Sequence, residues 1–225
     1  LGIQSGETLD VLMRDEELAG SVVLRGGNVT LRTDLLGVGH KIDKALVNRT
    51  IRTLQNADAE LFTKMIKAGA MESTFGIRPA YLCITHPDVI FSAQEIAGWK
   101  SVEEYASTGP VMDGERGAID DMRFLSTTMA KVYRDAGGTK VGDVKSLGGT
   151  SADVYTGLVF GQEAIAYVPL AGNSMNNIIK PVGSAGSNDP LNQVGTSGWK
   201  HVGARKILND AYMARFEVTA GEINP

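Results

Sequence analysis

The chain has 225 residues, of which 43% are hydrophobic and 21% charged, and its mean hydropathy is −0.06. This composition predicts a globular protein with a sizeable core, arranged as one large domain or two small ones. A net charge of −4 argues against a dedicated nucleic-acid binder, which needs clustered Lys and Arg to neutralise phosphates. No apolar run reaches the roughly 18 residues of a membrane span, and the first residues lack a signal-peptide pattern.

The single cysteine gives information on the cellular compartment, and the first residue on the limits of the chain. The single cysteine, Cys83, excludes an intrachain disulfide and lies in an apolar run, where a buried, unreactive thiol is expected. This usage suits a reducing cytoplasm. Leu1 rather than Met begins the chain and lies inside a helical pattern, so we expect a segment to precede it.

The N-terminal region predicts a long amphipathic helix over residues 6–24. Its apolar residues recur at helical spacing and are separated by a charged band at residues 14–17. Gly26 and Gly27 can adopt the left-handed conformation that ends a helix. The alternating pattern of residues 29–33 then predicts a strand.

A second helix is predicted over residues 42–56, followed by a loop of small residues over 65–76 and a buried strand over 80–85. Thr85 or His86 can cap the next helix, which begins at Pro87, where the missing N–H costs nothing. Asp88 favours the positive end of the helix dipole. We expect this helix to end near Gly98.

The second half of the chain is predicted to consist mainly of β-strands. Ser101 with Glu104 first forms a capping box for a short helix, and turn signals fill residues 108–117. Strands are predicted over 122–126, 154–160, 164–170, 177–182, 198–208 and 211–218, with a glycine-rich loop over 137–151 and a hairpin turn at Asn209–Asp210. Because helices and strands are interspersed without a βαβ rhythm, we predict an α+β fold.

The motif His86–Pro87–Asp88 is the strongest candidate for chemistry. A carboxylate can orient a histidine, and Cys83 lies three positions earlier as the nearest nucleophile. The capping interpretation accounts for the whole motif without catalysis. We therefore predict a structural role for His86, and no convergent cluster of titratable residues with shifted pKa values.

The remaining motifs are also expected to be structural, so we predict no catalytic, cofactor-binding or metal-binding residues. His40 and His201 lack the spacing of metal ligands. The Gly-rich turns at residues 37–41 and 148–151 do not complete a phosphate-binding motif. Other matches that complete no site are the glycosylation patterns at Asn28 and Asn48 and the carboxylate runs at residues 15–17 and 120–121.

Five stretches of the chain carry a resemblance to a known family. They are residues 18–20 with 26–29, residues 85–88, residues 114–124, residues 153–155 with Ala164 and 168–170, and residues 189–193 with 199–200 and 207–215. In their order and spacing they resemble the major capsid proteins of tailed bacteriophages, specifically the N-four-like podophage family with the HK ninety-seven type coat-protein fold. The resemblance covers nearly the whole chain, and its last stretch is the most persuasive.

The resemblance implies a division into domains. Residues 1–35 would give the spine helix and first strand of a peripheral domain, residues 36–194 mainly an axial domain, and residues 195–225 strands that return to the peripheral domain. Such proteins also carry an N-terminal arm and an extended β loop before the spine helix, which this sequence lacks. We therefore expect the 225-residue chain to be compromised in closing a shell.

The resemblance also implies a structural protein rather than an enzyme. Its partners would be copies of itself, in the hexamers and pentamers of an icosahedral head that encloses double-stranded DNA. Scaffolding, portal and decoration proteins would be further partners, and packaged DNA would be contacted non-specifically, with no membrane and no cofactor. The protein would reside in the virion after assembly in the bacterial cytoplasm.

Two alternatives remain open at this point. An encapsulin-like nanocompartment shell shares the fold but encloses protein cargo. A soluble α+β enzyme using His86 and Asp88 belongs to another class, and a deep pocket joining those side chains to another titratable group would favour it.

Overall fold

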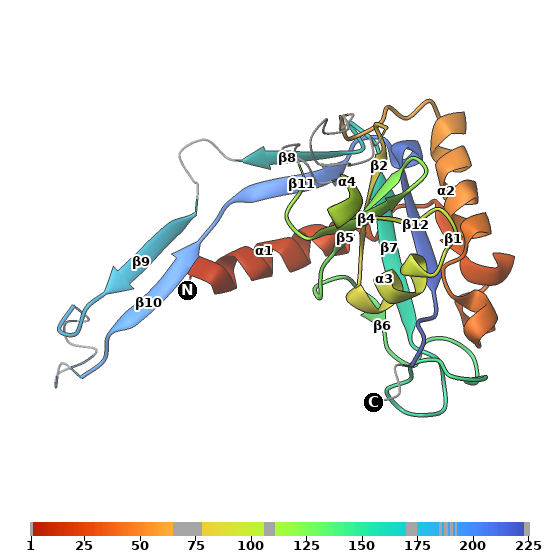
Figure 1. Ribbon diagram of the computed structural model, residues 1–225. Coiled ribbons are helices and arrows are strands. Elements are labelled where there is room, and N and C mark those ends of the chain that lie inside the picture. Colours follow the sequence, from red (N-terminus) through yellow and green to blue (C-terminus); the bar gives the residue numbers. More distant parts are fainter. Residues whose placement is uncertain are drawn as a thin grey trace.

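The structure is a computed structural model that describes residues 2–64, 78–105, 111–169, 175–184, 186, 189, 191 and 193–222. These residues form a compact body and an extended arm that projects from it (Figure 1). Helix α1 (Gly2–Glu17) and a two-stranded ribbon make up the arm. Among the described residues, no helix combines the length and the apolar character needed to cross a bilayer.

The body is built on one large mixed sheet. Its strands are β1 Val23–Arg25, β2 Tyr81–Thr85, β3 Lys100–Ser101, β4 Glu115–Ile119, β5 Met122–Ser126, β6 Val132–Tyr133, β7 Val154–Phe160 and β12 Met213–Val218. Their order is β1-β12-β7-β2-β5-β4-β3, with β6 paired to β7. Only β1–β12 and β2–β5 run parallel, so the sheet is not doubly wound.

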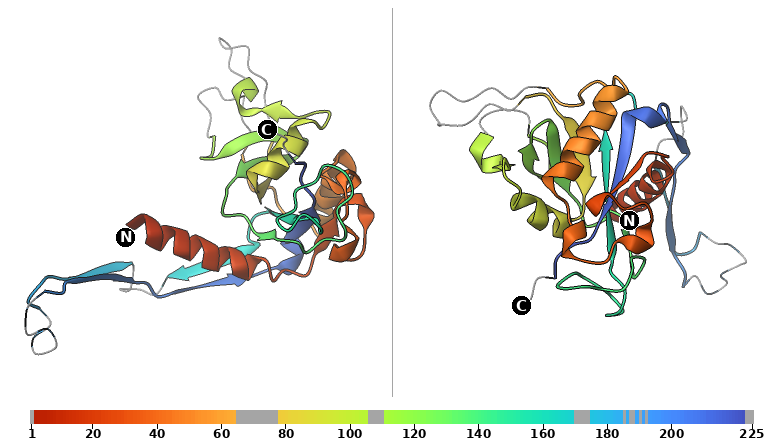
Figure 2. Two further views of the ribbon diagram at one scale, coloured as in Figure 1. Left: turned by 90° about the horizontal axis from the view of Figure 1, so that it is seen from below. Right: turned by 90° about the vertical axis from the view of Figure 1, so that its right-hand side faces the viewer.

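Two apolar layers cover the two faces of this sheet. On one face pack the helices α2 (Lys44–Asn56) and α3 (Pro87–Gln94); the other face meets Leu18, at the end of α1, and the base of the ribbon (Figure 2). Side chains of β2 alternate between the layers: Cys83 belongs to the first, Leu82 to the second. The middle of the sheet is therefore buried on both faces.

Helix α2 confirms the prediction for residues 42–56. The carboxylate of Asp43 accepts a hydrogen bond from the Leu46 backbone N–H at 2.8 Å and caps the helix. Strands β5 and β7 match their predicted bounds, and residues 137–151 form irregular loops as expected. A short helix, α4 (Val102–Tyr105), follows Ser101 where a helix was predicted.

The helix predicted over residues 6–24 is wrong at its C-terminal end. Helix α1 ends at Glu17, and Val23 lies in β1, which pairs with β12. Without this pairing β12 would be an open edge of the sheet. The strand predicted over residues 29–33 is also wrong, because this region contains the 3₁₀ turns η1 (Gly26–Asn28) and η2 (Arg32–Asp34). Gly27 is left-handed, with φ of 63°, but it follows a strand rather than a helix.

The hairpin predicted at Asn209–Asp210 is wrong. The predicted segment 198–208 consists of parts of two strands, β10 (Thr196–Lys200) and β11 (Gly203–Ile207), which pair with β9 (Asn176–Lys180) and β8 (Ile165–Pro169) to form the ribbon. Strand β12 pairs instead with β7 in the body. Between them Asn209 caps a 3₁₀ turn, η5 (Asp210–Tyr212), that leads the chain from the ribbon into the sheet.

A strand was missed where turns were predicted over residues 108–117. Gly114 takes a left-handed turn, with φ of 79°, and β4 begins at Glu115. Residues 106–110 and the loop predicted over 65–76 lie outside the described residues. The division into peripheral and axial domains at residues 35 and 194 stays a prediction, although the described residues group in space as the arm (α1 with residues 165–207) and the body.

Glu217 ties three segments of the body together. Its carboxylate accepts hydrogen bonds from Arg25 Nε at 2.9 Å and Arg32 Nη2 at 2.5 Å, and lies 3.4 Å from Arg215 Nε. Burial alone would raise the pKa of this carboxyl, but Arg32, Arg215 and Arg25 outweigh burial and hold the pKa below its usual value of 4.5. The stabilisation is therefore present above about pH 4.5 and is lost as the pH falls through the folded-state pKa.

We predict that Glu217→Gln lowers the free energy of unfolding at neutral pH by about 2–3 kcal/mol, because three arginines lose a charged partner. The variant should also lose less stability than the wild type between about pH 5 and pH 3. Urea unfolding followed by circular dichroism across this range measures both effects. The exposed control Glu16→Gln should change stability by less than about 0.5 kcal/mol. Parallel pH curves for the wild type and Glu217→Gln would contradict the assignment.

Candidate assembly surface

The arm is held together along its length. The Ser5 hydroxyl donates to the Met175 sulfur at 3.0 Å near the N-terminus of α1. Near the body, Arg205 of β11 forms an ion pair with Glu17 at 2.5 Å and contacts the Met13 sulfur at 3.0 Å. Helix α1 therefore follows the ribbon from its base toward its outer strands (Figure 2).

The ribbon leaves many apolar side chains in solvent. Ile179 is 72% exposed, Val168 63% and Ile178 48%, and all five residues of β9 are exposed. Of the 18 large hydrophobic residues that are exposed in the described part of the chain, 12 lie on α1 or within residues 165–208. A two-stranded ribbon is marginally stable in water by itself, and clustered exposed apolar residues mark interaction surfaces.

The ribbon end, formed by β9 and β10, has two chemically different faces. Residues opposite each other in an antiparallel pair project to the same side. Lys180 lies opposite Thr196, Ile178 opposite Gly198, and Lys200 opposite Asn176. These six residues form what we call the lysine face, on which Ile178 lies between two cations. The other face carries Asn177, Ile179, Ser197 and Trp199.

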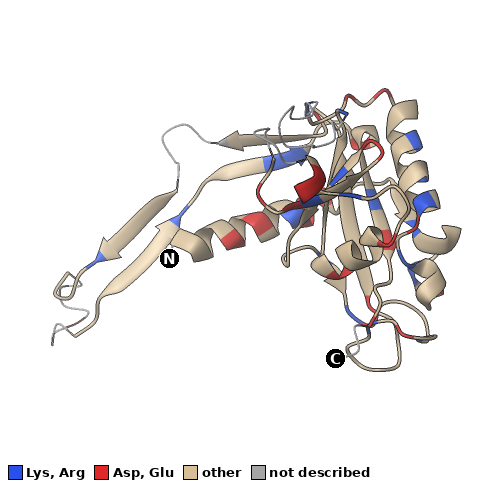
Figure 3. Cartoon of the chain, viewed as in Figure 1, with Lys and Arg blue, Asp and Glu red and all other residues tan. Residues whose placement is uncertain are grey.

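Charge is unevenly distributed along the arm. Helix α1 carries five acidic residues and one arginine, whereas residues 165–207 carry four basic residues and one acidic residue, Asp189. Acidic residues lie along α1 and basic residues along the ribbon (Figure 3). Within the described residues neither Lys180 nor Lys200 forms an ion pair. Two complementary charged surfaces are thus displayed by one chain.

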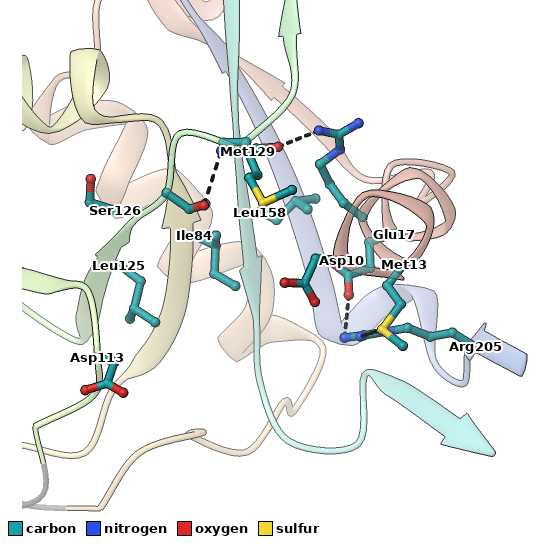
Figure 4. Close-up of a pocket in the computed structure, with 13 residues that line it drawn as sticks. Asp10, Met13, Glu17, Ile84, Asp113, Leu125, Ser126, Met129, Leu158 and Arg205 are labelled. Atoms are coloured by element: carbon teal, nitrogen blue, oxygen red, sulfur yellow. Dashed lines mark hydrogen bonds and ion pairs between the residues drawn. The ribbon is translucent and has the colours of Figure 1, made fainter. Parts of the chain in front are cut away.

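A cavity of about 300 Å³ lies where the arm meets the body (Figure 4). We call it the arm–body pocket. Its apolar lining comes from Met13 of α1 and from the sheet and the turn after it, through Ile84, Leu125, Met129 and Leu158. Its charged lining consists of Asp10, Arg14, Glu17, Asp113 and Arg205.

The cations of this pocket are already paired, but two of its carboxylates are not. Arg205 binds Glu17, and Arg14 binds Asp15 at 2.7 Å and the Met129 carbonyl. Burial raises the pKa of Glu17, Arg205 opposes the increase, and Asp10 adds to it. Among the described residues Asp10 and Asp113 form no ion pair. The pocket therefore retains excess negative charge.

The structure places His86 at the N-cap of α3, as predicted. Its Nδ1 accepts a hydrogen bond from the Asp88 backbone N–H at 3.2 Å, and Pro87 is the first helical residue. The pKa of His86 is lowered, mainly by burial and further by Lys145 and Arg134, although Asp88 opposes the shift. A neutral imidazole is the form that can accept this capping bond.

The expected absence of a cluster with shifted pKa values is wrong. Asp88 pairs with Lys145 at 2.8 Å, the Tyr155 ring lies 5.2 Å from the His86 ring, and Arg134 pairs with Asp153 at 2.9 Å. The pKa of Asp88 is lowered, because the hydrogen bonds and charges of its partners outweigh the effect of burial. Burial raises the pKa of Tyr155. Tertiary packing brings these residues together from segments that the sequence separates.

This cluster organises local structure. The buried Asp153 accepts hydrogen bonds from the backbone N–H groups of Asp135 at 2.8 Å and Leu147 at 3.3 Å, which fixes the glycine-rich loop. None of the three cavities described for this chain is lined by His86 or Asp88. Burial strongly raises the pKa of the Cys83 thiol, which disfavours the nucleophilic thiolate.

The other candidate residues lie apart from one another. His40 Nδ1 accepts from the backbone N–H of Leu36 at 3.2 Å, and His201 bonds the Tyr167 hydroxyl at 2.8 Å on the ribbon. No group of three or more potential metal ligands occurs within the described residues. The Asp120–Asp121 pair joins β4 to β5, and Asp120 pairs with Lys44. The sequence analysis did not identify the ribbon as a site. The signal available in the sequence was the occurrence of Ile and Val beside Lys over residues 178–182.

The overall arrangement matches a known architecture. The chain is similar to a solved chain from the capsid of Ralstonia phage GP4, with a TM-score of 0.59 and 16% sequence identity over 92% of this chain. The chain has a phage-capsid fold. It covers 54% of that capsid chain, so it spans about half the length of its structural neighbour. No protein-family profile matches the sequence, and no curated protein matches it either.

We predict that His86 stabilises the fold through its cap. His86→Ala should lower the free energy of unfolding by about 1 kcal/mol at neutral pH. Since the folded-state pKa is depressed, the contribution is present above about pH 6.5 and lost as the pH falls through that pKa. His86→Asn keeps a capping side chain without titration, so it should retain most of the stability and remove this pH dependence. Unfolding curves at about pH 7.5 and pH 5 test this; an unchanged pH dependence in both variants would refute it.

Proposed function

We propose that this chain is a structural protein of a tailed-phage head, which associates with copies of itself into the hexamers and pentamers of an icosahedral shell around double-stranded DNA. The observation that carries the proposal is a capsid fold whose arm leaves its apolar side chains uncovered. Shell subunits need broad heterologous contacts that repeat around an axis rather than a pocket for a substrate. The arm offers such a surface.

Within this proposal the finer assignment is the HK ninety-seven type coat-protein fold of the N-four-like podophages. In this assignment residues 1–35, with α1 as the spine helix, and residues 195–225 would belong to the peripheral domain, and residues 36–194 would be mainly axial. Scaffolding, portal and decoration proteins would be the other partners. The net charge of −4 supports only non-specific contact with packaged DNA. The site of action is the virion, after assembly in the host cytoplasm.

A nanocompartment shell of the encapsulin type is the second candidate, since the phage-capsid fold also suits a shell that encloses enzymes. The contents of assembled particles separate the two. Electron microscopy of particles from cells that express the protein, followed by assay of the contents for DNA and for protein cargo, distinguishes them. Particles filled with one protein species and no DNA would favour the nanocompartment.

We predict that the 225-residue chain associates in a concentration-dependent manner through the ribbon end. The double variant Ile178→Asp with Ile179→Asp places charge on both faces of the ribbon end and should weaken association at least about tenfold, because buried apolar contact is lost. Its melting temperature should stay close to that of the wild type, since these side chains are exposed. Sedimentation velocity over a range of concentrations measures the association.

The matched control is Val141→Asp with Leu147→Asp. Leu147 is as exposed as Ile179, at 72%, but lies in the glycine-rich loop of the body. Equal loss of association in both double variants would show that general apolar exposure, rather than the ribbon, drives self-association. A wild-type chain that stays monomeric at every concentration would contradict the proposed function.

A further inference from the structure

The arm–body pocket and the ribbon end are complementary in chemistry. The pocket has an apolar floor that includes Ile84 and Leu125, with unpaired carboxylates of Asp10 on the side of α1 and Asp113 on the side of β5 (Figure 4). The lysine face presents one apolar side chain, Ile178, between the ammonium groups of Lys180 and Lys200. An apolar centre flanked by two cations thus corresponds to an apolar centre flanked by two anions.

A single copy cannot make this contact with itself. The pocket lies at the base of the arm, whereas β9 and β10 lie at its outer end, beyond β8 and β11 (Figure 1). The contacts of Arg205 with Glu17 and of Ser5 with Met175 fix α1 along the ribbon between the two sites. The ribbon end can therefore reach this pocket only in another copy.

The charges also disfavour the simplest alternative, in which lysine faces of two copies meet. Such a contact would bring four ammonium groups together and leave Asp10 and Asp113 without partners. Like charges opposed across an interface cost affinity and suppress that pairing. Contact between the ribbon end and the acidic pocket instead neutralises both the lysines and the aspartates.

We propose that the lysine face of the ribbon end of one copy docks into the arm–body pocket of a second copy, with Ile178 over the apolar floor and Lys180 and Lys200 against Asp10 and Asp113. This inference rests on the proposed self-association and names the surfaces that carry it. Each copy gives its ribbon to one neighbour and receives a ribbon from another. The contact is heterologous, so it generates rings or extended arrays rather than closed pairs.

Charge reversal tests the pairing. One variant carries Lys180→Glu with Lys200→Glu, and a second carries Asp10→Lys with Asp113→Lys. In a solution of either variant alone, every contact brings like charges together. Each variant should therefore associate at least about tenfold more weakly than the wild type. Mixed in equal amounts, they should recover association, because every ribbon then finds a pocket of opposite charge on the other variant. Sedimentation velocity of each variant and of the mixture measures this.

The control reverses two exposed lysines outside both surfaces, Lys64→Glu with Lys206→Glu, and should associate like the wild type. If the wild type associates and the reversed variants do so equally well, the docking is wrong while the proposed function stands. If both variants weaken and their mixture stays dissociated, the docking is also wrong. A wild type that never associates overturns the docking and the proposed function together.

Cross-linking tests which face of the ribbon docks. Ser126 lines the pocket and Cys83 is buried, so engineered thiols report on the contact without competition. Ile178→Cys with Ser126→Cys should give intermolecular disulfides on mild oxidation, visible as a ladder on a non-reducing gel. Ile179→Cys with Ser126→Cys projects the thiol from the opposite face and should give at most a tenth of that yield. Equal yields from both pairs, or equal yield from Ile178→Cys alone, would overturn the proposal.

Discussion

A two-stranded ribbon cannot bury both of its faces with its own side chains, and this constraint governs the outer part of the molecule. In the body, helices α2 and α3 cover one face of the large sheet, while Leu18 and the ribbon base cover part of the other. Beyond the body, α1 is the one described helix that accompanies the ribbon, and β9 remains exposed along its whole length. The ribbon end is therefore stable only marginally until another surface covers it. In a chain built in this way, the largest uncovered apolar surface lies where another molecule can reach it.

Ion pairs where the arm joins the body hold charged side chains in fixed positions. Arg205 of β11, which lines the arm–body pocket, binds Glu17 at the end of α1, and within the described part of the chain Asp10 and Asp113 have no ion pair. Glu217 and its arginines hold β1 and β12 at the edge of the sheet directly after α1. Ion pairs at these junctions set geometry more than they add stability, because taking charges out of water offsets much of their attraction. The unpaired groups that remain are the ones available to neighbours.

The polar residues around His86 have structural roles in the fold. His86 caps α3, Asp88 binds Lys145, and Asp153 orders the glycine-rich loop through backbone N–H groups. Shifted pKa values accompany active sites, but structural networks of partly buried charges produce them as well. Here the shifts follow from burial and from partners already engaged in caps and ion pairs. Under the proposed function, the extended surface of the arm is the feature that a shell protein would use.

The sequence by itself determined the elements whose signals are local. The extent of α2, the His86–Pro87 start of α3 and the apolar runs of β5 and β7 were predictable because periodicity, caps, proline and burial act on neighbouring residues. Tertiary structure alone decided the rest. Val23 joined β1 rather than α1, and residues 203–207 paired with β8 rather than with β12, because strand pairing selects a partner far along the chain. The arm–body pocket, whose lining spans Asp10 to Arg205, exists only once those pairings have formed, since no local pattern records which distant side chains will meet.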